Sequence, residues 1–239
     1  LFSDAFAVFH FASKVGGMNY YLNNQFQVMK DNITIDNNVL EIAKLKKVKN
    51  YFYASSSHVY PLRFQSTKKI IKLNEKHAEL FQPSISYGWA KLIGEKQISY
   101  LKNSFQNTFI ARYVGIYGPA QDASFANGSL IPVLAHKAIK YPKSNFEVLT
   151  DGSEIRSYCY IDDAIDCSKK LIEKFGNKNN NHHIINICSN NFYTVKQIAR
   201  IIIKISKKKI IVKYNKNNAV NIKSQFCSNN KVKKIIKWK

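Results

Sequence analysis

The sequence predicts an α/β fold, in which a doubly wound parallel sheet is covered by helices and followed by a smaller mixed α/β lobe. Three observations predict it. Short apolar runs alternate with longer segments of helical spacing through the first half of the chain. Those short runs are apolar on both faces, as buried parallel strands are. After Gly118-Pro119 the segments become shorter and their rhythm looser.

The first half contains five predicted elements in alternation. Residues 5–11 (AFAVFHF), 51–55 (YFYAS) and 108–113 (TFIARY) are short apolar runs that predict buried strands. Residues 28–45 and 86–101 carry apolar side chains at helical spacing and predict helices. This β-α-β-α-β order favours parallel strands joined by helical crossovers.

The second half contains shorter predicted elements. Asp151-Gly152 predicts a tight turn between two strands. Asp162 and Thr194 are expected to cap the helices that follow them, and the asparagine-rich residues 177–181 and 215–218 are expected to form surface loops. Helices are predicted at 130–139, 162–175, 195–205 and 231–238, and strands at 146–149, 157–160, 184–187 and 210–212.

The formal net charge is +22, which raises the question of nucleic-acid binding. The lysines are scattered instead of forming one stripe, and the densest cluster, Lys207 to Lys209, predicts a solvated turn between apolar runs. We therefore expect no nucleic-acid partner. A positive potential does attract phosphate-bearing substrates.

Neither a membrane nor a metal is indicated. No stretch approaches the roughly 18 to 20 apolar residues that span a bilayer. Cys159, Cys167, Cys188 and Cys227 form no Cys-x-x-Cys pair, so zinc and disulfide frameworks are not expected. Reduced thiols in a cytoplasmic protein are the default expectation.

The segment Ser86-Tyr87-Gly88-Trp89-Ala90-Lys91 is the strongest local feature. Tyr87 and Lys91 are four residues apart, so they share one face of the predicted helix. A phenol has a pKa of about 10, and a neighbouring ammonium lowers it. Such a pair can move a proton to or from a sugar hydroxyl while a hydride passes to or from a nicotinamide.

A hydroxyl-rich segment follows the second predicted strand: Tyr53-Ala54-Ser55-Ser56-Ser57-His58-Val59-Tyr60-Pro61. Side chains at the carboxyl ends of parallel strands point into the crevice where such sheets bind ligands. Ser56 and its neighbours are therefore expected near the Tyr87–Lys91 pair.

These motifs form an ordered series that resembles the extended short-chain dehydrogenase/reductase family of nucleotide-sugar epimerases and dehydratases. The series covers essentially the whole chain: VFHFAS, NITIDNNVLEIA, YASSSHVYP, LNEKHAELFQPSISYGWAKL, ARYVGIYGP, DGSEIRSYCYIDD and NICSNN. The resemblance implies a Rossmann-like fold. Residues 1–118 would be the remainder of the NAD(P)-binding domain and 119–239 mainly the substrate-binding lobe, with 160–190 returning to the sheet.

Two details are similar to the GDP-fucose synthase and GDP-mannose 3,5-epimerase branch. Residues 13–18 (SKVGGM) resemble a loop of that branch, and Tyr60-Pro61 also suits it. A simple tight turn is the alternative interpretation of Gly16-Gly17. The implied function is an epimerase or epimerase/reductase acting on a GDP-sugar through a transient keto sugar. A UDP- or dTDP-sugar 4-epimerase or dehydratase, and a catalytically silent nucleotide-sugar-binding homologue, stay open as alternatives.

By this resemblance Ser56, Tyr87 and Lys91 form the hydride-transfer triad. Ser56 would bond the sugar oxygen, Tyr87 would be the acid/base, and Lys91 would bind the nicotinamide ribose and tune Tyr87. The other implied residues contact or support cofactor and substrate. For the cofactor they are Ala12, Ser13 and Asn32, and for the substrate Lys14, Gly16, Gly17, Ser57, Ser129 and Arg156.

Four positions depart from the branch. His58 stands where the branch has a proton-moving Cys, and an imidazole can do such work near neutral pH; a structural histidine is the alternative. Ser129 stands where relatives have a second acid/base, Gly115 where they have a substrate-contacting Asn, and Ser224 near a nucleotide-binding Arg.

The family's phosphate-cradling G-x-x-G-x-x-G turn is absent from the nine glycines of this sequence. The first strand resembles the family's fourth, so we expect the amino-terminal part of the cofactor domain to lie outside this sequence. The choice between NAD and NADP therefore cannot be read. The resemblance also implies a homodimer.

Overall fold

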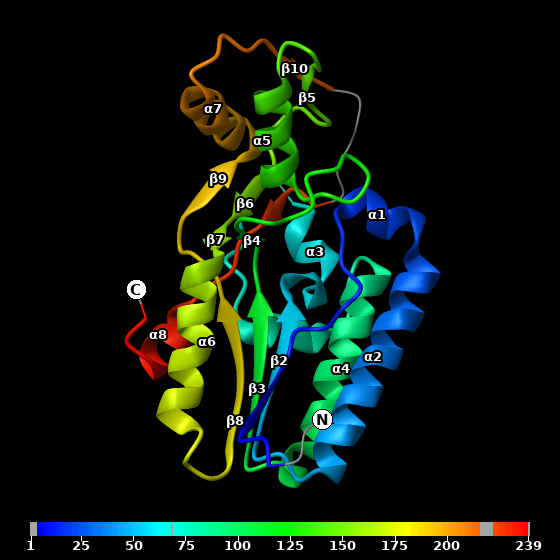
Figure 1. The fold of residues 1–239 in the computed structure, drawn as a ribbon, viewed down its shortest axis with the longest axis vertical. Helices are drawn as coiled ribbons and strands as arrows, with labels where there is room; N and C mark the ends of the chain where they lie inside the picture. The colour runs from blue at the N-terminus through cyan, green and yellow to red at the C-terminus, as the bar shows by residue number, and fades with distance from the viewer. Residues whose placement is uncertain (1–3, 68, 216–221, 239) are drawn as a thin grey trace.

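The computed structural model describes residues 4–67, 69–215 and 222–238 (Figure 1). Within these residues a central sheet has the strand order β1-β2-β3-β8, and its neighbouring strands all run parallel. Helix α6 lies on one side of this sheet, and α2 and α4 lie on the other (Figure 1). The four strands are β1 (Ala7–His10), β2 (Asn50–Ser56), β3 (Asn107–Tyr113) and β8 (Asn181–Ile187).

Alternating side chains build a separate core on each face of the sheet. Phe52 and Phe109 pack with Leu171 of α6, whereas Tyr51 packs with Leu40 of α2 on the opposite face. This period-two alternation in strands covered on both sides confirms the predicted α/β fold class. The helices of eight residues or more are α2 (Gln25–Leu45), α4 (Ser86–Leu101), α5 (Leu130–Lys140), α6 (Ile161–Phe175) and α7 (Val195–Ser206).

A second group of elements lies beyond the carboxyl ends of the central strands (Figure 1). Helices α5 and α7 pack together over small sheets, around a core that includes Leu134, Phe146 and Ile198. The strands are β4 (Ile116–Tyr117), β5 (Phe146–Val148), β6 (Ile155–Ser157), β7 (Cys159–Tyr160), β9 (Phe192–Thr194), β10 (Val212–Tyr214) and β11 (Ser224–Gln225). The short helices are α1 (Met18–Asn23), α3 (Leu62–Gln65), α8 (Asn230–Ile235) and the 3₁₀ turns Ser57–Val59, Glu75–Leu80 and Lys102–Ser104.

The segment around Asp151-Gly152 connects two short strands, β5 and β6, as predicted. Strand β5 pairs in parallel with β10, and β6 lies between β9 and β11, so the strands on the two sides of the turn do not pair with each other. Gly152 does have a left-handed φ of +77°, which explains the turn signal. The turn therefore joins two small sheets instead of two partners in one sheet.

Of the two predicted helix caps, one is wrong and one is confirmed. Tyr160 occupies the N-cap position of α6 and makes no side-chain capping bond. Asp162 lies inside the first turn, where its negative charge interacts favourably with the helix dipole. Thr194 caps α7 and forms a capping box with Gln197.

Other boundaries differ from the predicted ones in smaller ways. The strand predicted at 210–212 is β10, displaced toward the carboxyl end. Asn181 begins β8 instead of ending a loop, and of the predicted loop at 215–218 residues 216–218 lie outside the described residues. Lys208 is not simply solvated, because its Nζ donates to three carbonyls at the end of α5 (Ala138, Ile139 and Tyr141) at 2.5–3.1 Å.

The outer edge of β1 is open within the described part of the chain, because no described strand pairs with it. Phe6, Phe9 and Phe11 beside it are 39–52% exposed. An open edge next to exposed aromatic rings is a surface that proteins ordinarily cover. In the same described residues, no helix is both long and apolar enough to cross a bilayer.

Candidate functional site

The predicted catalytic residues meet at the carboxyl ends of β1 and β2. Ser56 is the last residue of β2 and caps the 3₁₀ turn that holds His58. The segment after β1 runs past the same edge, and the first turn of α4 brings Tyr87 to it. Three segments that are distant in sequence therefore converge where parallel sheets bind ligands.

Tyr87 and Lys91 lie one turn apart on α4 and are both buried, at 7% and 1% exposed. The Lys91 Nζ lies 4.7 Å from the ring centre of Tyr53 and 5.9 Å from that of Tyr87. Among the described residues it has no hydrogen-bond partner. Burial lowers the pKa of Lys91, and Asp36 and Glu95 oppose that shift.

Burial also raises the pKa of the Tyr87 phenol above its usual value near 10, and the hydroxyl of Ser13 acts in the opposite direction. The phenol is therefore protonated at neutral pH in this structure. It can donate a proton directly, and it needs the nearby ammonium of Lys91 to release one.

Gly88 sets the distance between α4 and the turn that carries His58. A Cβ at Gly88 would lie 2.2 Å from the His58 carbonyl oxygen, so no larger residue fits without moving backbone. This close approach places the His58 and Tyr87 rings edge to face, with their centres 5.6 Å apart. Local packing thus explains why the Tyr-Gly-x-x-Lys segment has a glycine at its second position.

Replacing Gly88 with alanine is therefore expected to displace α4 from the turn. The free energy of unfolding should fall by about 1–3 kcal/mol, as for other overpacked sites. Turnover by the complete natural polypeptide should fall further than stability alone explains. Urea unfolding and initial rates check this, with Lys96→Ala on the exposed side of α4 as the control. An unchanged rate in Gly88→Ala would show that the spacing is not needed.

His58 is hydrogen-bonded to Ser56, with Nδ1 and Oγ 3.0 Å apart. Burial, and secondarily the charge of Arg156, lowers the pKa of His58 from 6.5 to about 4. The imidazole is therefore neutral at pH 7 and has a nitrogen able to accept a proton. This state suits a general base better than a general acid.

The lowered pKa of His58 predicts a dependence of stability on pH. Between pH 6.5 and about 4 the unfolded chain binds a proton at this histidine and the folded chain does not. Stability from this group is therefore fully present above pH 6.5 and lost as the pH falls toward 4, by up to about 3 kcal/mol. Urea unfolding of the parent and His58→Gln between pH 4 and 7 checks it; a constant difference between the two proteins contradicts it.

Tyr21, on the short helix α1, is a site residue that no sequence signal indicated. Its ring stacks on Tyr87 at 4.7 Å between centres and meets His58 edge-on at 5.8 Å. Burial raises the pKa of Tyr21 to about 12, although a backbone contact with Gly16 and a hydrogen bond with Tyr87 act against it. Tyr21 thus covers the rings of Tyr87 and His58 on the side that faces the loop after β1.

Asn32 on α2 holds the loop that follows β1. Its amide oxygen accepts from Ser13 Oγ at 2.5 Å and Lys14 N at 2.9 Å, and its amide nitrogen donates to the Lys14 and Val28 carbonyls. These bonds occupy the whole amide, so Asn32 acts on the loop and does not itself reach a ligand. Ala12 and Lys14 are exposed on that loop.

The glycines Gly16 and Gly17 are not left-handed turn residues. Gly17 has φ −76°, and its N–H donates to the Asn127 carbonyl at 2.6 Å. A Cβ there would lie 2.3 Å from the Gly128 oxygen. Gly17 therefore permits contact with the loop that leads to Ser129, which itself takes the N-cap position of α5.

Arg156 is partly buried and bonded only to backbone carbonyls, those of Ile155 and Ile222. In residues 4–67, 69–215 and 222–238 no carboxylate lies within ion-pair distance of its guanidinium. Its charge does reach His58, whose pKa it lowers. The neighbouring carboxylate of Glu154 acts on this guanidinium only from beyond ion-pair distance, so the guanidinium is suited to an anionic ligand.

The remaining residues singled out from the sequence have structural surroundings that explain their identity or position. Ser57 is buried in the 3₁₀ turn, and its carbonyl accepts from Tyr60 N at 3.3 Å. Gly115 has φ +56°, and a Cβ there would lie 2.1 Å from the Ser157 oxygen. An Asn at that position would not fit this backbone. Ser224 pairs with Ile155 in the small sheet that carries Arg156.

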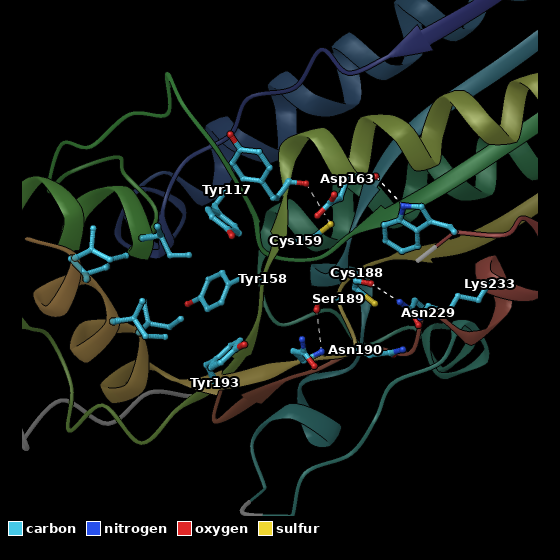
Figure 2. A pocket seen from close by; sticks show the side chains of 18 residues that line it. Tyr117, Tyr158, Cys159, Asp163, Cys188, Ser189, Asn190, Tyr193, Asn229 and Lys233 are labelled. Carbon is cyan, nitrogen blue, oxygen red and sulfur yellow. Dashed lines mark hydrogen bonds between the residues drawn. The ribbon is translucent and has the colours of Figure 1, made fainter.

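A separate cavity of about 650 Å³ lies between α6, α7 and the chain end, lined by Tyr117, Tyr158 and Tyr193 among others (Figure 2). Its lining contains none of the predicted site residues. The convergence of motif residues, and not the size of a cavity, therefore identifies the candidate site.

Comparisons with known proteins agree with the fold described above. Over 97% of its length the chain is 26% identical to GDP-mannose 3,5-epimerase of Arabidopsis thaliana, of which it spans 60%. A UDP-glucose 4-epimerase from Thermotoga maritima, solved with UDP-glucose, superposes with a TM-score of 0.81 at 20% identity, covering 95% of this chain and 70% of that one. A UDP-glucuronic acid 4-epimerase from Bacillus cereus, solved with UDP-glucuronic acid and NAD, gives 0.80 at 24% identity, covering 98% and 69%.

The family model described as "NAD dependent epimerase/dehydratase family" matches residues 1–188, the part that holds the sheet, Ser56, Tyr87, Lys91 and Arg156. The chain therefore belongs to the NAD-dependent epimerase/dehydratase family.

Proposed function

We propose that the complete protein is an NAD(P)-dependent nucleotide-sugar epimerase or epimerase/reductase that acts on a GDP-sugar through a transient keto sugar. One observation carries this proposal. The buried Tyr87–Lys91 pair lies beside the hydrogen-bonded Ser56 and His58 at the carboxyl edge of the sheet. In this proposal, groups suited to hydride transfer and a group suited to proton exchange lie next to one another.

Lys91 would bind the nicotinamide ribose in this proposal. The Lys91 Nζ is buried without a hydrogen-bond partner among the described residues, so it has donors free for ribose hydroxyls. Ser13, on the loop that Asn32 fixes, lies beside Tyr87 and would contact the cofactor on the other side, with Ala12. When bound, the cofactor supplies the site that takes up and returns a hydride.

The residues of this chain divide the proton work. Ser56 would hold the sugar oxygen. Tyr87 would first release its own proton to solvent with the help of the Lys91 ammonium, and would then take the proton from the sugar oxygen and later return it. Once a keto group is formed, the protons on its neighbouring carbons become acidic. His58, neutral because burial lowers its pKa to about 4, would remove and return such a proton.

The charge of Arg156 supports a diphosphate-bearing substrate. Its guanidinium lies near His58 without an acidic partner among the described residues. The sugar would be surrounded by two groups of residues. One group is the loop that contacts residues 127–128, with Lys14, Gly16 and Gly17, and the other is Ser57 and Ser129. The guanine nucleotide is favoured because the chain is similar to a GDP-mannose 3,5-epimerase, a GDP-L-colitose synthase and a GDP-L-fucose synthase.

Ser129 limits the reaction that we propose. A serine hydroxyl is a poor acid at neutral pH, so a two-base epimerisation with a strong second acid is not expected. His58 would then perform the proton exchange alone and on one face of the sugar. Exchange on one face returns the proton to the face that it left, so inversion would need solvent to deliver the proton to the opposite face. A reductase step, which would then reduce the keto group, stays part of the proposal.

The open edge of β1 supports a larger cofactor domain. The strands that would cradle the pyrophosphate would pair with this edge and cover Phe9 and Phe11. In this proposal residues 1–118 contribute the cofactor side and residues 119–239 mainly the substrate side, with 160–190 returning to the sheet. A cytoplasmic homodimer binding a nucleotide sugar, and neither nucleic acid nor membrane, completes it.

Two alternatives keep specific support. A UDP- or dTDP-sugar 4-epimerase or dehydratase is favoured by the similarity in fold to UDP-sugar 4-epimerases. A silent nucleotide-sugar-binding homologue would retain Arg156 and Lys91 as binding residues only.

Product analysis with a panel of nucleotide sugars tests the proposal. The complete natural polypeptide is incubated with NAD or NADP and GDP-, UDP- or dTDP-hexoses, and the products are separated and identified. Conversion of a GDP-hexose is the expected result. Conversion of only UDP- or dTDP-sugars would overturn the GDP assignment, and binding without any conversion would indicate the silent homologue.

A further inference from the structure

A buried carboxylate faces the candidate catalytic lysine from a different helix. Asp36 projects from the middle of α2 and is 3% exposed. Its Oδ1 lies 3.9 Å from the Nζ of Lys91 on α4, and both side chains are almost completely removed from solvent. A charge in such a place is costly unless another charge or several hydrogen bonds compensate it.

Asp36 is held by two further groups from the sheet. The Nε2 of His10 on β1 lies 2.8 Å from Oδ1, and the Tyr53 hydroxyl on β2 donates to Oδ2. The void beside the carboxylate leaves no volume for a water molecule. Gly94 makes the arrangement possible, because a Cβ there would lie 2.4 Å from the Tyr53 oxygen and 3.0 Å from Oδ2. The carboxylate is therefore fixed by protein groups alone.

The other charged groups around Lys91 do not offer it a free anion. Glu95, on the same helix, is engaged by Arg112 at 2.6 and 2.8 Å and also accepts from Ser55. Tyr53 and Tyr87 present ring faces to the ammonium. Of the described carboxylates near Lys91, Asp36 is thus the one whose charge no arginine or other lysine neutralises.

We infer that Asp36 is a positioning residue for the reaction: it is the counter-ion that keeps the buried Lys91 ammonium charged, and through Lys91 it controls proton release from Tyr87. This inference rests on the proposed function only where it assigns Lys91 a role beside Tyr87. His10 and Tyr53 orient Asp36 so that one oxygen faces the lysine.

The electrostatics of the pair agree with this role. Burial lowers the pKa of Lys91, and Asp36 is the largest influence that raises it again. The same carboxylate raises the pKa of Tyr87. Asp36 therefore acts on the two groups together, holding the cation in place while opposing premature loss of the phenol proton.

The test is Asp36→Asn in the complete natural polypeptide, with Glu41→Gln on the exposed side of α2 as the control. The amide keeps the shape and removes the charge. Lysines are labelled with ¹³C at Cε, and the Lys91 signal is assigned by its loss in Lys91→Met. The Lys91 pKa should fall by about 1–2 units in Asp36→Asn and stay in place in Glu41→Gln. An unchanged Lys91 pKa in Asp36→Asn overturns the inference.

A double-mutant cycle keeps the test decisive if Asp36→Asn weakens the fold. Asp36→Asn should lower the free energy of unfolding much more in the parent than in Lys91→Met, because only the parent has an attraction between the two charges to lose. Equal destabilisation in both backgrounds overturns the pairing.

Kinetics separate this inference from the proposed function. In an active enzyme the alkaline limb of the kcat/KM profile should move to lower pH by the same 1–2 units. If the Lys91 pKa moves but no nucleotide sugar is converted by the parent, the proposed function fails and the role of Asp36 as counter-ion stands.

Discussion

Replacing Tyr87 with phenylalanine is expected to lower kcat for nucleotide-sugar conversion by about 10²–10⁴-fold, the range attributed to positioned acid/base groups. The change removes only the phenolic oxygen. The ring keeps its stack on Tyr21 at 4.7 Å and its edge contact with His58, so the walls of the site are retained. Initial rates with the preferred nucleotide sugar measure the loss.

Tyr100→Phe is the matched control, because Tyr100 is on the same helix and 85% exposed. It should leave both rate and stability unchanged. Tyr87→Phe should unfold within about 1–2 kcal/mol of the parent, since the hydrogen bonds of the phenol with Ser13 and Tyr21 are lost. A Tyr87→Phe protein that turns over at more than a tenth of the parental rate would contradict the role of the phenol.

Replacing His58 with glutamine is expected to separate proton exchange from hydride transfer. Glutamine can still bond Ser56, but it cannot take up a proton at any ordinary pH. Exchange of sugar carbon protons with solvent should therefore fall by about 10²–10³-fold. Formation of reduced nicotinamide from bound substrate should change by less than about tenfold, because Ser56, Tyr87 and Lys91 are untouched.

The control for this change is His136→Gln, at an exposed histidine on α5. It should behave as the parent does in both measurements. If His58→Gln loses hydride transfer and proton exchange to the same extent, then His58 orients Ser56 through their 3.0 Å hydrogen bond and is not itself a proton carrier.

The long elements of this fold could be predicted because their signals are local. Helix α4 begins and ends at the residues that its apolar spacing predicted, and the three strands of the first half differ from prediction by one or two residues at their ends. The turn at Asp151-Gly152 was also predicted, but the pairing partners of the strands on its two sides were not. Left-handed glycine reports the turn, but which strands pair is decided by tertiary contacts with β9, β10 and β11.

The residues of the candidate site also fall into those that sequence spacing predicted and those that only tertiary contacts reveal. Ser56 with His58, and Tyr87 with Lys91, are each close in sequence, so spacing alone placed them together. Tyr21 was missed because α1 is a short helix after a loop, and its stacking on Tyr87 is purely tertiary.

Asp36 was missed because acidic residues in an amphipathic helix are ordinarily exposed. Only the packing of α2 on α4 turns it toward Lys91. The function of Asn32 also needed the structure, since its four hydrogen bonds to Ser13, Lys14 and Val28 show that it fixes the loop.

Incorporation of solvent deuterium tests the account most directly. The complete natural polypeptide is incubated with NAD or NADP and each nucleotide sugar in D₂O, and the recovered sugar is analysed by mass spectrometry and NMR. The account predicts deuterium on carbons next to the transient keto group of a GDP-sugar, with strongly reduced incorporation by both Tyr87→Phe and His58→Gln. A parent protein that interconverts or binds nucleotide sugars without incorporating any deuterium would contradict it.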